Sequence, residues 1–435
     1  MKIGFHTLGC KVNQYETEAI AKLFTDEGWE TGDFRESCDA YLINTCTVTS
    51  LSDRKSRQMI RRAKQANPDA VIAVCGCYAQ MAKDEVAAIE GVDIVIGTKE
   101  KGRAYELITK SLRDHKKYNI VSELGEESFE DMQVTTYENK TRAIIKAQDG
   151  CNNFCSYCVI PYARGRVRSR DPESIYRECC ALAEKGFREI VLSGIHICSY
   201  GKDFEQFGLG ELLQKIHDIE GIRRIRLSSI EPNAFTDRFI QIIQSLPKVC
   251  HHFHMSLQSG CDATLKRMNR KYTAEEYRQI VKKLRAVFPD VSITTDIIVG
   301  FPGETEEEFE DTLRFAREIG FYMIHVFKYS VRKGTAAEKM TGHIPPETKE
   351  RRSKMLMQLA AESKTAFEKS YVGKMQEVLF EQPHDGYFFG LTPNYLHVYV
   401  KTEKNLEGEF QNVQIENFES GKLQGRIQEK EDPNL

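Results

Sequence analysis

Three cysteines in one short segment carry the strongest chemical signal of this sequence. The segment reads DGCNNFCSYCVIPYARGRVRSR and places Cys151, Cys155 and Cys158 at the spacing C-x3-C-x2-C. Three thiolates in one loop can each bind one iron of a cubane iron–sulfur cluster, and the missing fourth ligand leaves one iron open to a substrate or cofactor. The alternative is a zinc site, but zinc usually takes two cysteine pairs, and this loop offers no fourth ligand.

A second set of cysteines is spread over the first hundred residues. Cys10 lies in TLGCKVNQYETE, Cys46 in INTCTVTS and Cys77 in CGCYAQ, each directly after a predicted strand. Because the carboxyl ends of parallel strands meet at one edge of a sheet, these thiols can converge on a second cluster. Cys75 is an alternative to Cys77 as the third ligand of this cluster. Cys75 lies at the end of the predicted strand, whereas Cys77 lies in the loop beyond it, so we expect Cys77 to be the ligand. The alternative is three unrelated buried cysteines.

The elements that position the second set alternate between strands and helices. The spacing of apolar residues predicts strands at 2–7, 40–44, 70–75 and 93–97, with helices at 16–27, 52–65 and 79–89 between them. This alternation indicates an open, mainly parallel α/β sheet, and we assign it to a domain of residues 1–115. The stretch 101–141 is charged and weakly patterned, which indicates a connector, placed at 116–140.

The first cysteine segment follows the first strand of a second alternation. Strands are predicted at 143–147, 189–193, 224–228, 252–257, 293–299 and 323–329, and helices between them include 172–185, 274–287 and 306–319. Six such units predict a partial (β/α)6 barrel over residues 141–345. Barrel chemistry occurs at the carboxyl ends of the strands, and both Cys151 and Gly300 fall directly after a strand.

The end of the chain changes character after a pair of prolines. A charged amphipathic helix is predicted at 347–371, and we assign residues 346–370 to a helical linker. Short alternating runs at 375–381, 387–391, 396–401 and 412–417 predict a small all-β domain over residues 371–435. This segment is acidic, with 6 Lys and Arg against 11 Asp and Glu.

Composition narrows the class of protein. The 435 residues include 13 cysteines, an odd number that favours metal ligands and buried thiols over a disulfide framework. The net charge of −3 gives no global nucleic-acid signature, so any RNA contact must be local. No apolar run reaches 18 residues and the first residues lack the layout of a secretion signal, so we expect no membrane partner and a cytoplasmic protein.

The motif C-x3-C-x-aromatic-C after the first barrel strand resembles that of the radical S-adenosylmethionine (SAM) superfamily. The resemblance implies a 4Fe–4S cluster whose open iron chelates SAM, and a 5′-deoxyadenosyl radical released when SAM is reduced. It also implies contacts to SAM from Tyr157 and from the strand ends that carry Ser193, Gly194, Gln258 and Gly300. A packing role for the tyrosine and simple turn chemistry at the strand ends are the alternatives.

Two cysteine sets in this order, followed by a small β domain, resemble the methylthiotransferase family over essentially the whole chain. The resemblance implies a TRAM domain at the C-terminus, two 4Fe–4S clusters and two uses of SAM, as methyl donor and as radical source. It assigns the sulfur to be transferred to the cluster of Cys10, Cys46 and Cys77. The radical that removes hydrogen from the target carbon is assigned to the other cluster. A reducing electron donor such as a flavodoxin or ferredoxin is implied as a partner.

The residues around Cys10 bear on the substrate. The phrase FHTLGCKVNQYETEAI is most similar to the branch that modifies C2 of N6-threonylcarbamoyladenosine beside the anticodon of tRNA. The isopentenyladenosine branch reads nearer GCQMNEYDS, and the ribosomal-protein branch reads nearer GCPKN. Arg164, Arg166 and Arg168 follow the first cysteine segment where an RNA backbone would approach, although a solvated rim explains them equally well.

Three readings of the function therefore stand side by side. The leading one is a tRNA methylthiotransferase that acts on threonylcarbamoyladenosine. The acidic C-terminal domain suits a basic protein partner, so the same chemistry on a ribosomal protein is kept as an alternative. Isopentenyladenosine in tRNA is a further alternative substrate. A non-enzymatic alternative is an iron–sulfur sensor or RNA-binding scaffold that does not cleave SAM.

Overall fold

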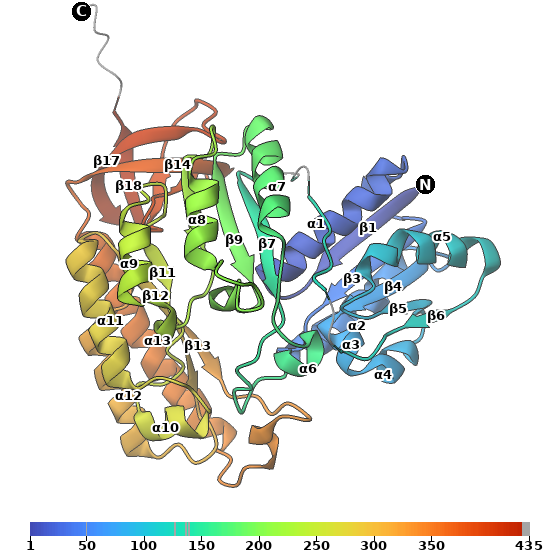
Figure 1. Cartoon of the computed structure of the whole chain (residues 1–435), viewed down its shortest axis with the longest axis horizontal. Helices are drawn as coiled ribbons and strands as arrows, with labels where there is room; N and C mark the ends of the chain where they lie inside the picture. Colours follow the sequence, from blue (N-terminus) through green and yellow to red (C-terminus); the bar gives the residue numbers. More distant parts are fainter. Residues whose placement is uncertain (49, 126–127, 135–136, 138–139, 429–435) are drawn as a thin grey trace, which may run out of the picture.

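The computed structural model describes residues 1–48, 50–125, 128–134, 137 and 140–428, and it divides into three units (Figure 1). An N-terminal sheet with its helices lies on one side of a central α/β unit. A small β-barrel, formed by the C-terminal strands, packs on the central unit away from the N-terminal sheet. The fold class predicted from the sequence is confirmed.

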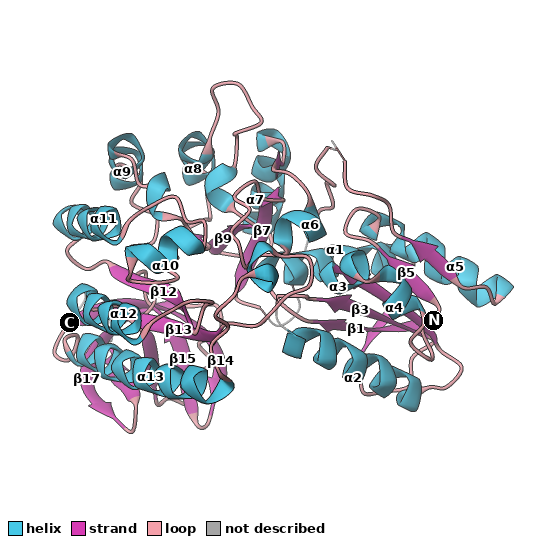
Figure 2. Cartoon of the chain, turned by 90° about the horizontal axis from the view of Figure 1, so that it is seen from below, coloured by secondary structure: helices cyan, strands magenta, loops and turns pink. Residues whose placement is uncertain are grey.

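The N-terminal unit is a six-stranded, fully parallel sheet in the order β2-β1-β3-β4-β5-β6. Its strands are β1 (Lys2–Thr7), β2 (Glu30–Gly32), β3 (Ala40–Thr45), β4 (Val71–Gly76), β5 (Ile94–Ile96) and β6 (Tyr118–Ile120). Helices α1 (Lys11–Asp26) and α5 (Ala104–Asp114) cover one face, and α2 (Ser50–Ala66), α3 (Cys77–Met81) and α4 (Lys83–Ala87) cover the other (Figure 2). Because both faces are covered, every residue of β3 and β4 is buried, as parallel strands require.

The structure corrects several predicted boundaries in this unit. Helix α1 begins at Lys11 rather than at residue 16, because Asn13 and Glu16 are buried polar residues that interrupt the apolar pattern. Two short helices, α3 and α4, replace the single helix predicted at 79–89. The edge strands β2 and β6 have three residues each and little apolar character, and α5 lies within the stretch 101–141 that was predicted as a connector.

The central unit contains the six predicted parallel strands. They are β7 (Arg142–Asp149), β9 (Glu189–Gly194), β10 (Arg224–Leu227), β11 (His252–His254), β12 (Ser292–Val299) and β13 (Met323–Lys328). They pair in two groups, β10-β9-β7-β8 and β11-β12-β13, with the two-residue β8 (Arg168–Ser169) antiparallel to the end of β7. Isolated bridges from Ile225 to Val249 and from Ile230 to Met255 connect the groups into one curved wall.

Helices cover only the outer side of this wall. They are α7 (Pro172–Glu184), α8 (Leu209–His217), α9 (Asp237–Gln244), α10 (Asp262–Arg267), α11 (Ala274–Val287) and α12 (Glu306–Ile319). Among the described residues no strand pairing joins β13 back to β8, so the barrel is partial. Helix α1 of the N-terminal unit contacts β7 and β9 and lies beside them (Figure 1), which brings the loop of Cys10 to the open side of the barrel.

The C-terminal unit is a closed five-stranded barrel in the order β14-β15-β16-β18-β17. Helix α13 (Pro346–Lys369) leads into β14 (Met375–His384), β15 (Tyr387–Leu391), β16 (His397–Val400), β17 (Phe410–Glu419) and β18 (Lys422–Ile427). Arg224 and Arg226 of β10 donate hydrogen bonds to carbonyl oxygens of Leu391 and Pro393 at 2.8 and 3.0 Å. This barrel therefore closes the amino-terminal end of the central strands. Of the helices that the structure describes, none combines the length and the apolar character needed to cross a bilayer.

Candidate functional site

The structure brings Cys10, Cys46 and Cys77 to one edge of the N-terminal sheet. They follow β1, β3 and β4, which are neighbours in the sheet. Burial raises the pKa of Cys46 to about 11, and the charges of Cys77 and Cys10 contribute to that rise, so the three thiols lie close together. Gly9 permits this approach, because it has φ +105° and a Cβ there would stand 2.7 Å from Cβ of Cys46.

The choice between Cys75 and Cys77 follows from their surroundings. Cys75 is fully buried inside β4 and packs in the apolar cluster beneath α1 and α5, where burial raises its pKa to about 12. Cys77 is the first residue of α3 rather than part of a loop as predicted, and its Sγ accepts a hydrogen bond from Nε of Arg164 at 3.3 Å. Only the second of these thiols belongs to the group with Cys10.

The other cysteine set lies in the loop after β7, at the carboxyl end of the central strands. Cys151, Cys155 and Cys158 are all partly exposed. Burial raises the pKa of Cys158 to about 12, and the charges of the neighbouring Cys155 and Cys151 add to the rise. Nη1 of Arg270 donates to Sγ of Cys155 at 3.1 Å and places a positive charge where thiolates must form to bind metal.

Arg270 is held by a group of residues that sequence reasoning missed. Its Nη2 lies 2.7 Å from Oε1 of Glu231, which also accepts a hydrogen bond from Nδ2 of Asn153 at 2.9 Å. Burial alone would raise the pKa of Glu231, but the hydrogen bond with His196 and the charge of Arg270 lower it to about 2. Asn153, His196 and Glu231 follow three different strands, and Arg270 lies between α10 and α11, so only the topology of the barrel brings them together.

Arg164 lies between the two cysteine sets and is not on the surface. It ends α6 (Ile160–Arg164), six residues after Cys158, and its side chain is completely buried. In addition to Cys77, it donates to Oε1 of Glu16 at 2.6 Å, to Oδ1 of Asn13 at 2.5 Å and to Oδ2 of Asp149 at 3.2 Å. The prediction that Arg164 meets an RNA backbone is therefore wrong.

The other two arginines of that prediction differ from each other. Arg168 is buried in β8, with Nη2 at 3.8 Å from Oδ2 of Asp149, so it is also unavailable to RNA. Arg166 is exposed, and its guanidinium lies 4.6 Å from the ring centre of Phe154 in the cysteine loop. Of the three, Arg166 alone is placed where a ligand outside the barrel could meet it.

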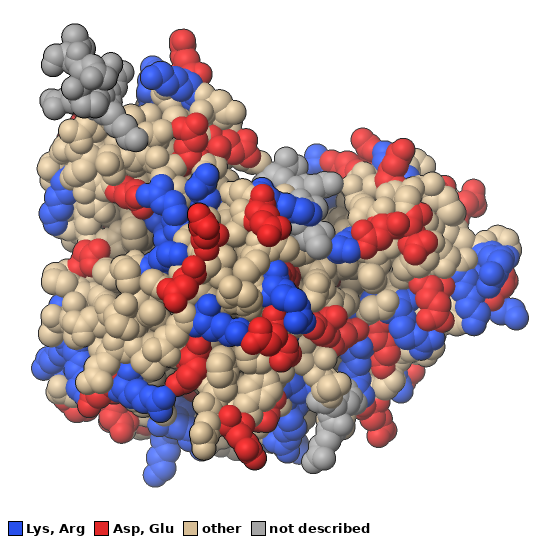
Figure 3. Space-filling view, turned by 45° about the horizontal axis from the view of Figure 1, so that its top comes forward, with Lys and Arg blue, Asp and Glu red and all other residues tan. Residues whose placement is uncertain are grey.

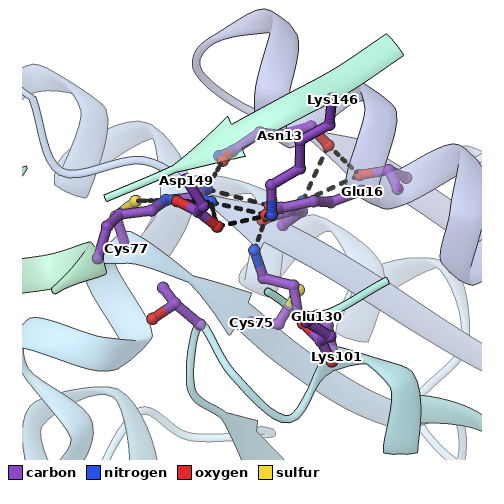
Figure 4. A network of polar contacts seen from close by, with 12 residues as sticks. Asn13, Glu16, Cys75, Cys77, Lys101, Glu130, Lys146 and Asp149 are labelled. Atoms are coloured by element: carbon purple, nitrogen blue, oxygen red, sulfur yellow. Dashed lines mark hydrogen bonds and ion pairs between the residues drawn. The ribbon is translucent and has the colours of Figure 1, made fainter. Parts of the chain in front are cut away.

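Buried cations and carboxylates form a network of ion pairs around Arg164, and Figure 4 shows its lysines and carboxylates. Glu16 pairs with Arg164, Lys101 and Lys146, and Lys146 also lies 2.6 Å from Asp149. Burial alone would raise the pKa of Glu16, but these three cations hold it well below its usual range. The guanidinium that donates to Sγ of Cys77 is therefore anchored by two buried carboxylates, those of Glu16 and Asp149.

The residues predicted to contact SAM lie along one rim of the barrel. Ser193 and Gly194 end β9, Gln258 follows β11, and Gly300 follows β12 with φ +72°. Gln258 has φ +69°, an uncommon conformation for a residue with a side chain. The ring of Tyr157 is half-buried and meets the ring of Phe301 edge-on, with 6.4 Å between the ring centres. The contacts of all these residues with SAM stay a prediction.

A further group of polar residues lies deeper in the barrel. Ligand atoms of His254, Asp296 and His325, from three adjacent strands, lie within 4.8 Å of one another. Nε2 of His254 is 3.2 Å from Oδ2 of Asp296, and its Nδ1 is 3.0 Å from Oγ1 of Thr294. Both ring nitrogens of His254 therefore already contact protein groups. Burial lowers the pKa of His325, and the charges of His254 and Lys11 lower it further.

Family models match each unit of the chain. The model of the radical SAM superfamily matches residues 145–316, and that of the TRAM domain matches residues 369–427. Residues 2–97 match a family described as "Uncharacterized protein family UPF0004".

Curated relatives match the chain over nearly its whole length. The threonylcarbamoyladenosine tRNA methylthiotransferase MtaB of Bacillus subtilis is 42% identical over 420 residues, which cover 95% of this chain and 93% of the relative. The chain belongs to the radical SAM methylthiotransferase family. The MtaB protein of Aquifex aeolicus is 39% identical, with coverage of 92% and 96%. The tRNA-2-methylthio-N(6)-dimethylallyladenosine synthase of Dictyoglomus thermophilum is also 39% identical, with coverage of 97% of each chain.

Solved structures confirm the fold alone. The radical SAM methyltransferase TsrM of Kitasatospora setae, solved with cobalamin and a [4Fe-4S] cluster, superposes with a TM-score of 0.55 at 16% identity, over 75% of this chain and 74% of that one. The cobalamin-dependent SAM radical enzyme OxsB, with SAM bound, gives a TM-score of 0.51 at 12% identity, over 83% and 61%.

Methylthiotransferases of this family use SAM and two 4Fe–4S clusters, and the residues of this chain fit those cofactors. Each set offers three thiols whose charges affect one another, and at least one cation donates a hydrogen bond to a thiol of each set. Thiolates that bind different irons of one cluster stand further apart than thiolates that bind a single ion. Two sets of three neighbouring thiols that are not in mutual contact therefore fit clusters.

Proposed function

We propose that this protein transfers a methylthio group to C2 of N6-threonylcarbamoyladenosine beside the anticodon of tRNA. The observation that carries the proposal is the pair of three-cysteine sets at the carboxyl ends of two parallel sheets, connected through the buried Arg164. The MtaB relatives, whose names state this nucleoside, support the choice of substrate.

In this proposal each cysteine set has its own role. Cys151, Cys155 and Cys158 hold the cluster that binds SAM, and the set of Cys10, Cys46 and Cys77 holds the second cluster. When bound, these cofactors supply the electron, the radical that removes hydrogen from the target carbon, and the methylthio group. The chain itself orients and stabilises the thiolates through hydrogen bonds from Arg270 and Arg164, described above.

Other residues of the rim complete the proposed site. We assign contacts with SAM to Tyr157, Ser193, Gly194, Gln258 and Gly300, which lie at the carboxyl ends of the central strands, where barrel enzymes bind their ligands. A flavodoxin or ferredoxin is the proposed class of electron donor. The proposed domains are residues 1–115, 141–345 and 371–435, with a connector at 116–140 and a helical linker at 346–370.

A basic face of α2 supports tRNA as the partner. Arg54, Arg61 and Arg62 line a shallow groove of about 490 Å³ on this helix and are exposed. No ion pair of these three arginines with another described residue is found, although Arg57, between them, pairs with Glu85 at 3.3 Å. Because α2 begins a few residues after Cys46, it leads from the cysteine site toward the outside, a suitable path for a phosphate backbone.

The face of the molecule seen in Figure 3 is consistent with a local contact of this kind. On the face shown in Figure 3, acidic and basic side chains are interspersed and form no field of a single sign. The acidic C-terminal barrel therefore needs recognition by shape or stacking if it touches RNA. A stripe of arginines beside the cysteine site supplies the electrostatic attraction that the net charge of −3 does not.

The test uses the full chain with both clusters reconstituted anaerobically. It is incubated with SAM, dithionite and anticodon stem-loop RNAs that carry threonylcarbamoyladenosine, dimethylallyladenosine or plain adenosine. We expect 2-methylthio product and 5′-deoxyadenosine with the first RNA. Product only with the second RNA would move the substrate to the dimethylallyl branch. The absence of product from all three RNAs, with 5′-deoxyadenosine still released, would overturn the assignment to tRNA and favour a protein substrate.

A further inference from the structure

The region of the barrel that faces the set of Cys10, Cys46 and Cys77 carries several charged side chains, and apolar residues such as Ile144 and Val191 share its lining. Arg142 of β7 and Arg226 of β10 flank the buried carboxylate of Glu189, with Nε of Arg226 at 2.8 Å and Nη1 of Arg142 at 4.0 Å from its Oε1. His254 and His325 on the opposite wall belong to the polar group described above. An apolar group that entered this region would have to displace water from charged side chains, which costs free energy.

Lys11 adds a further cation to this region. It is the residue after Cys10 and the first residue of α1, and its exposed side chain lines a cavity of about 540 Å³ between α1, β7, β9 and the C-terminal barrel. Arg142 lines the same cavity but is paired with Oε1 of Glu381 at 2.6 Å. Within the described part of the chain, no carboxylate lies at ion-pair distance from Nζ of Lys11.

The geometry of a purine relates this cation to the site of the reaction. C2 and C6 flank N1 of the ring, so the substituent on N6 projects from the same edge as C2. A base whose C2 is placed at the cysteine set of Cys10 therefore presents its N6 substituent to the residues beside Cys10. The threonylcarbamoyl group ends in a carboxylate, whereas the dimethylallyl group is a hydrocarbon. An unpaired ammonium in a partly enclosed cavity favours the first group and disfavours the second.

We propose that Lys11 binds the carboxylate of the threonylcarbamoyl group and thereby selects this nucleoside over N6-dimethylallyladenosine. The inference rests on the proposed function and adds the residue that sets its specificity. Overall similarity does not supply that residue, because relatives named for the two nucleosides match this chain at comparable identity.

The test compares two RNAs that differ in one charge. One anticodon stem-loop carries threonylcarbamoyladenosine, and the other carries the same nucleoside with its carboxylate converted to the carboxamide. For the reconstituted wild-type enzyme we expect kcat/KM and affinity to favour the carboxylate by roughly 10- to 100-fold, the effect of one charge-assisted hydrogen bond. Lys11→Gln should lose this preference and leave turnover of the carboxamide within about threefold of wild type, while Lys11→Arg should keep most of it.

Controls separate recognition from damage to the neighbouring cysteine. Lys140→Gln removes another lysine of the cavity lining, whose Nζ pairs with Glu18, and should leave the preference unchanged. Iron content is measured for each variant, and a loss in Lys11→Gln alone would assign the effect to the cluster. Equal losses on both RNAs, or a preference that survives Lys11→Gln, would overturn the inference. A wild-type enzyme that modifies neither RNA would instead refute the proposed function.

Discussion

The buried ionic network around Arg164 makes a quantitative prediction about how the first two units are held together. Glu16 comes from α1 and Lys101 from the 3-10 helix Lys101–Arg103 in the N-terminal unit, whereas Lys146, Asp149 and Arg164 come from the central unit. All five side chains are essentially buried. Removing one partner of a buried ion pair costs about 3–5 kcal/mol, because the remaining charge stays desolvated.

The position of each residue in the network ranks two substitutions. Arg164→Met leaves Lys101, Lys146 and Arg168 opposite Glu16 and Asp149, so both carboxylates keep a cation and the cost should be about 3 kcal/mol. Glu16→Gln removes the ion-pair partner of Lys101 and leaves Lys146, Arg164 and Arg168 to share Asp149, so its cost should reach about 5 kcal/mol. Glu16→Gln, which hardly changes the shape of the side chain, should therefore destabilise the protein more than Arg164→Met, which changes it strongly.

Hydrogen exchange of the reconstituted protein measures these costs where they arise. Protection of amides in α1 and β7 should fall by roughly 100-fold in Arg164→Met and by several thousand-fold in Glu16→Gln. The matched control is Arg352→Met, because Arg352 is also buried and pairs with Glu304 at 2.8 Å, but lies in α13. The control should not change protection in α1. An effect of Arg164→Met equal to or larger than that of Glu16→Gln would refute the charge balance on which the ranking depends.

Three further predictions concern metal, pH and RNA. Cys46→Ser should lower the iron content from about eight to about four per chain, whereas Cys75→Ala should keep about eight, as measured after reconstitution. Burial raises the pKa of Glu130 from 4.5 to about 7, so the folded state holds a proton between these values and stability falls as pH rises. Glu130→Gln should remove up to about 3 kcal/mol of that fall in urea unfolding at pH 5 and pH 8. Neutralising Arg61 and Arg62 should weaken stem-loop binding and lower the slope of log Kd against log salt by about one per lost phosphate contact, and an unchanged slope would exclude that face.

The convergence of the cysteines could be predicted because it depends on topology alone. Apolar runs fixed the strands, parallel strands end at one edge, and so Cys10, Cys46 and Cys77 had to meet there. The same reasoning placed Cys151 and Gly300 on one rim of the barrel. These predictions need only the order and type of the elements, which periodicity gives directly.

The fate of the arginines could not be predicted because it depends on partners far along the chain. A run such as ARGRVRSR is typical of a solvated surface, yet Arg164 is paired with Glu16 and Arg170 with Glu178, both buried. Nothing within a local window shows that a carboxylate 148 positions away will enclose a guanidinium. The same buried carboxylate disturbs the apolar periodicity of α1, which explains why the predicted helix began too late.

The first two turns of α1 explain how one short segment can serve the cofactor and the substrate independently. At 100° per residue, Lys11 and Gln14 share one face of the helix, and Asn13 and Glu16 share the opposite face. The first face lines the cavity proposed for the N6 substituent, and the second holds Arg164 beside the cysteine site. A change on the cavity face can therefore alter which nucleoside is accepted without disturbing the charges around the cluster. Because the two faces are separate, we expect that a substitution at Lys11, directly beside the cluster ligand Cys10, can change the preferred N6 substituent while the chemistry stays the same.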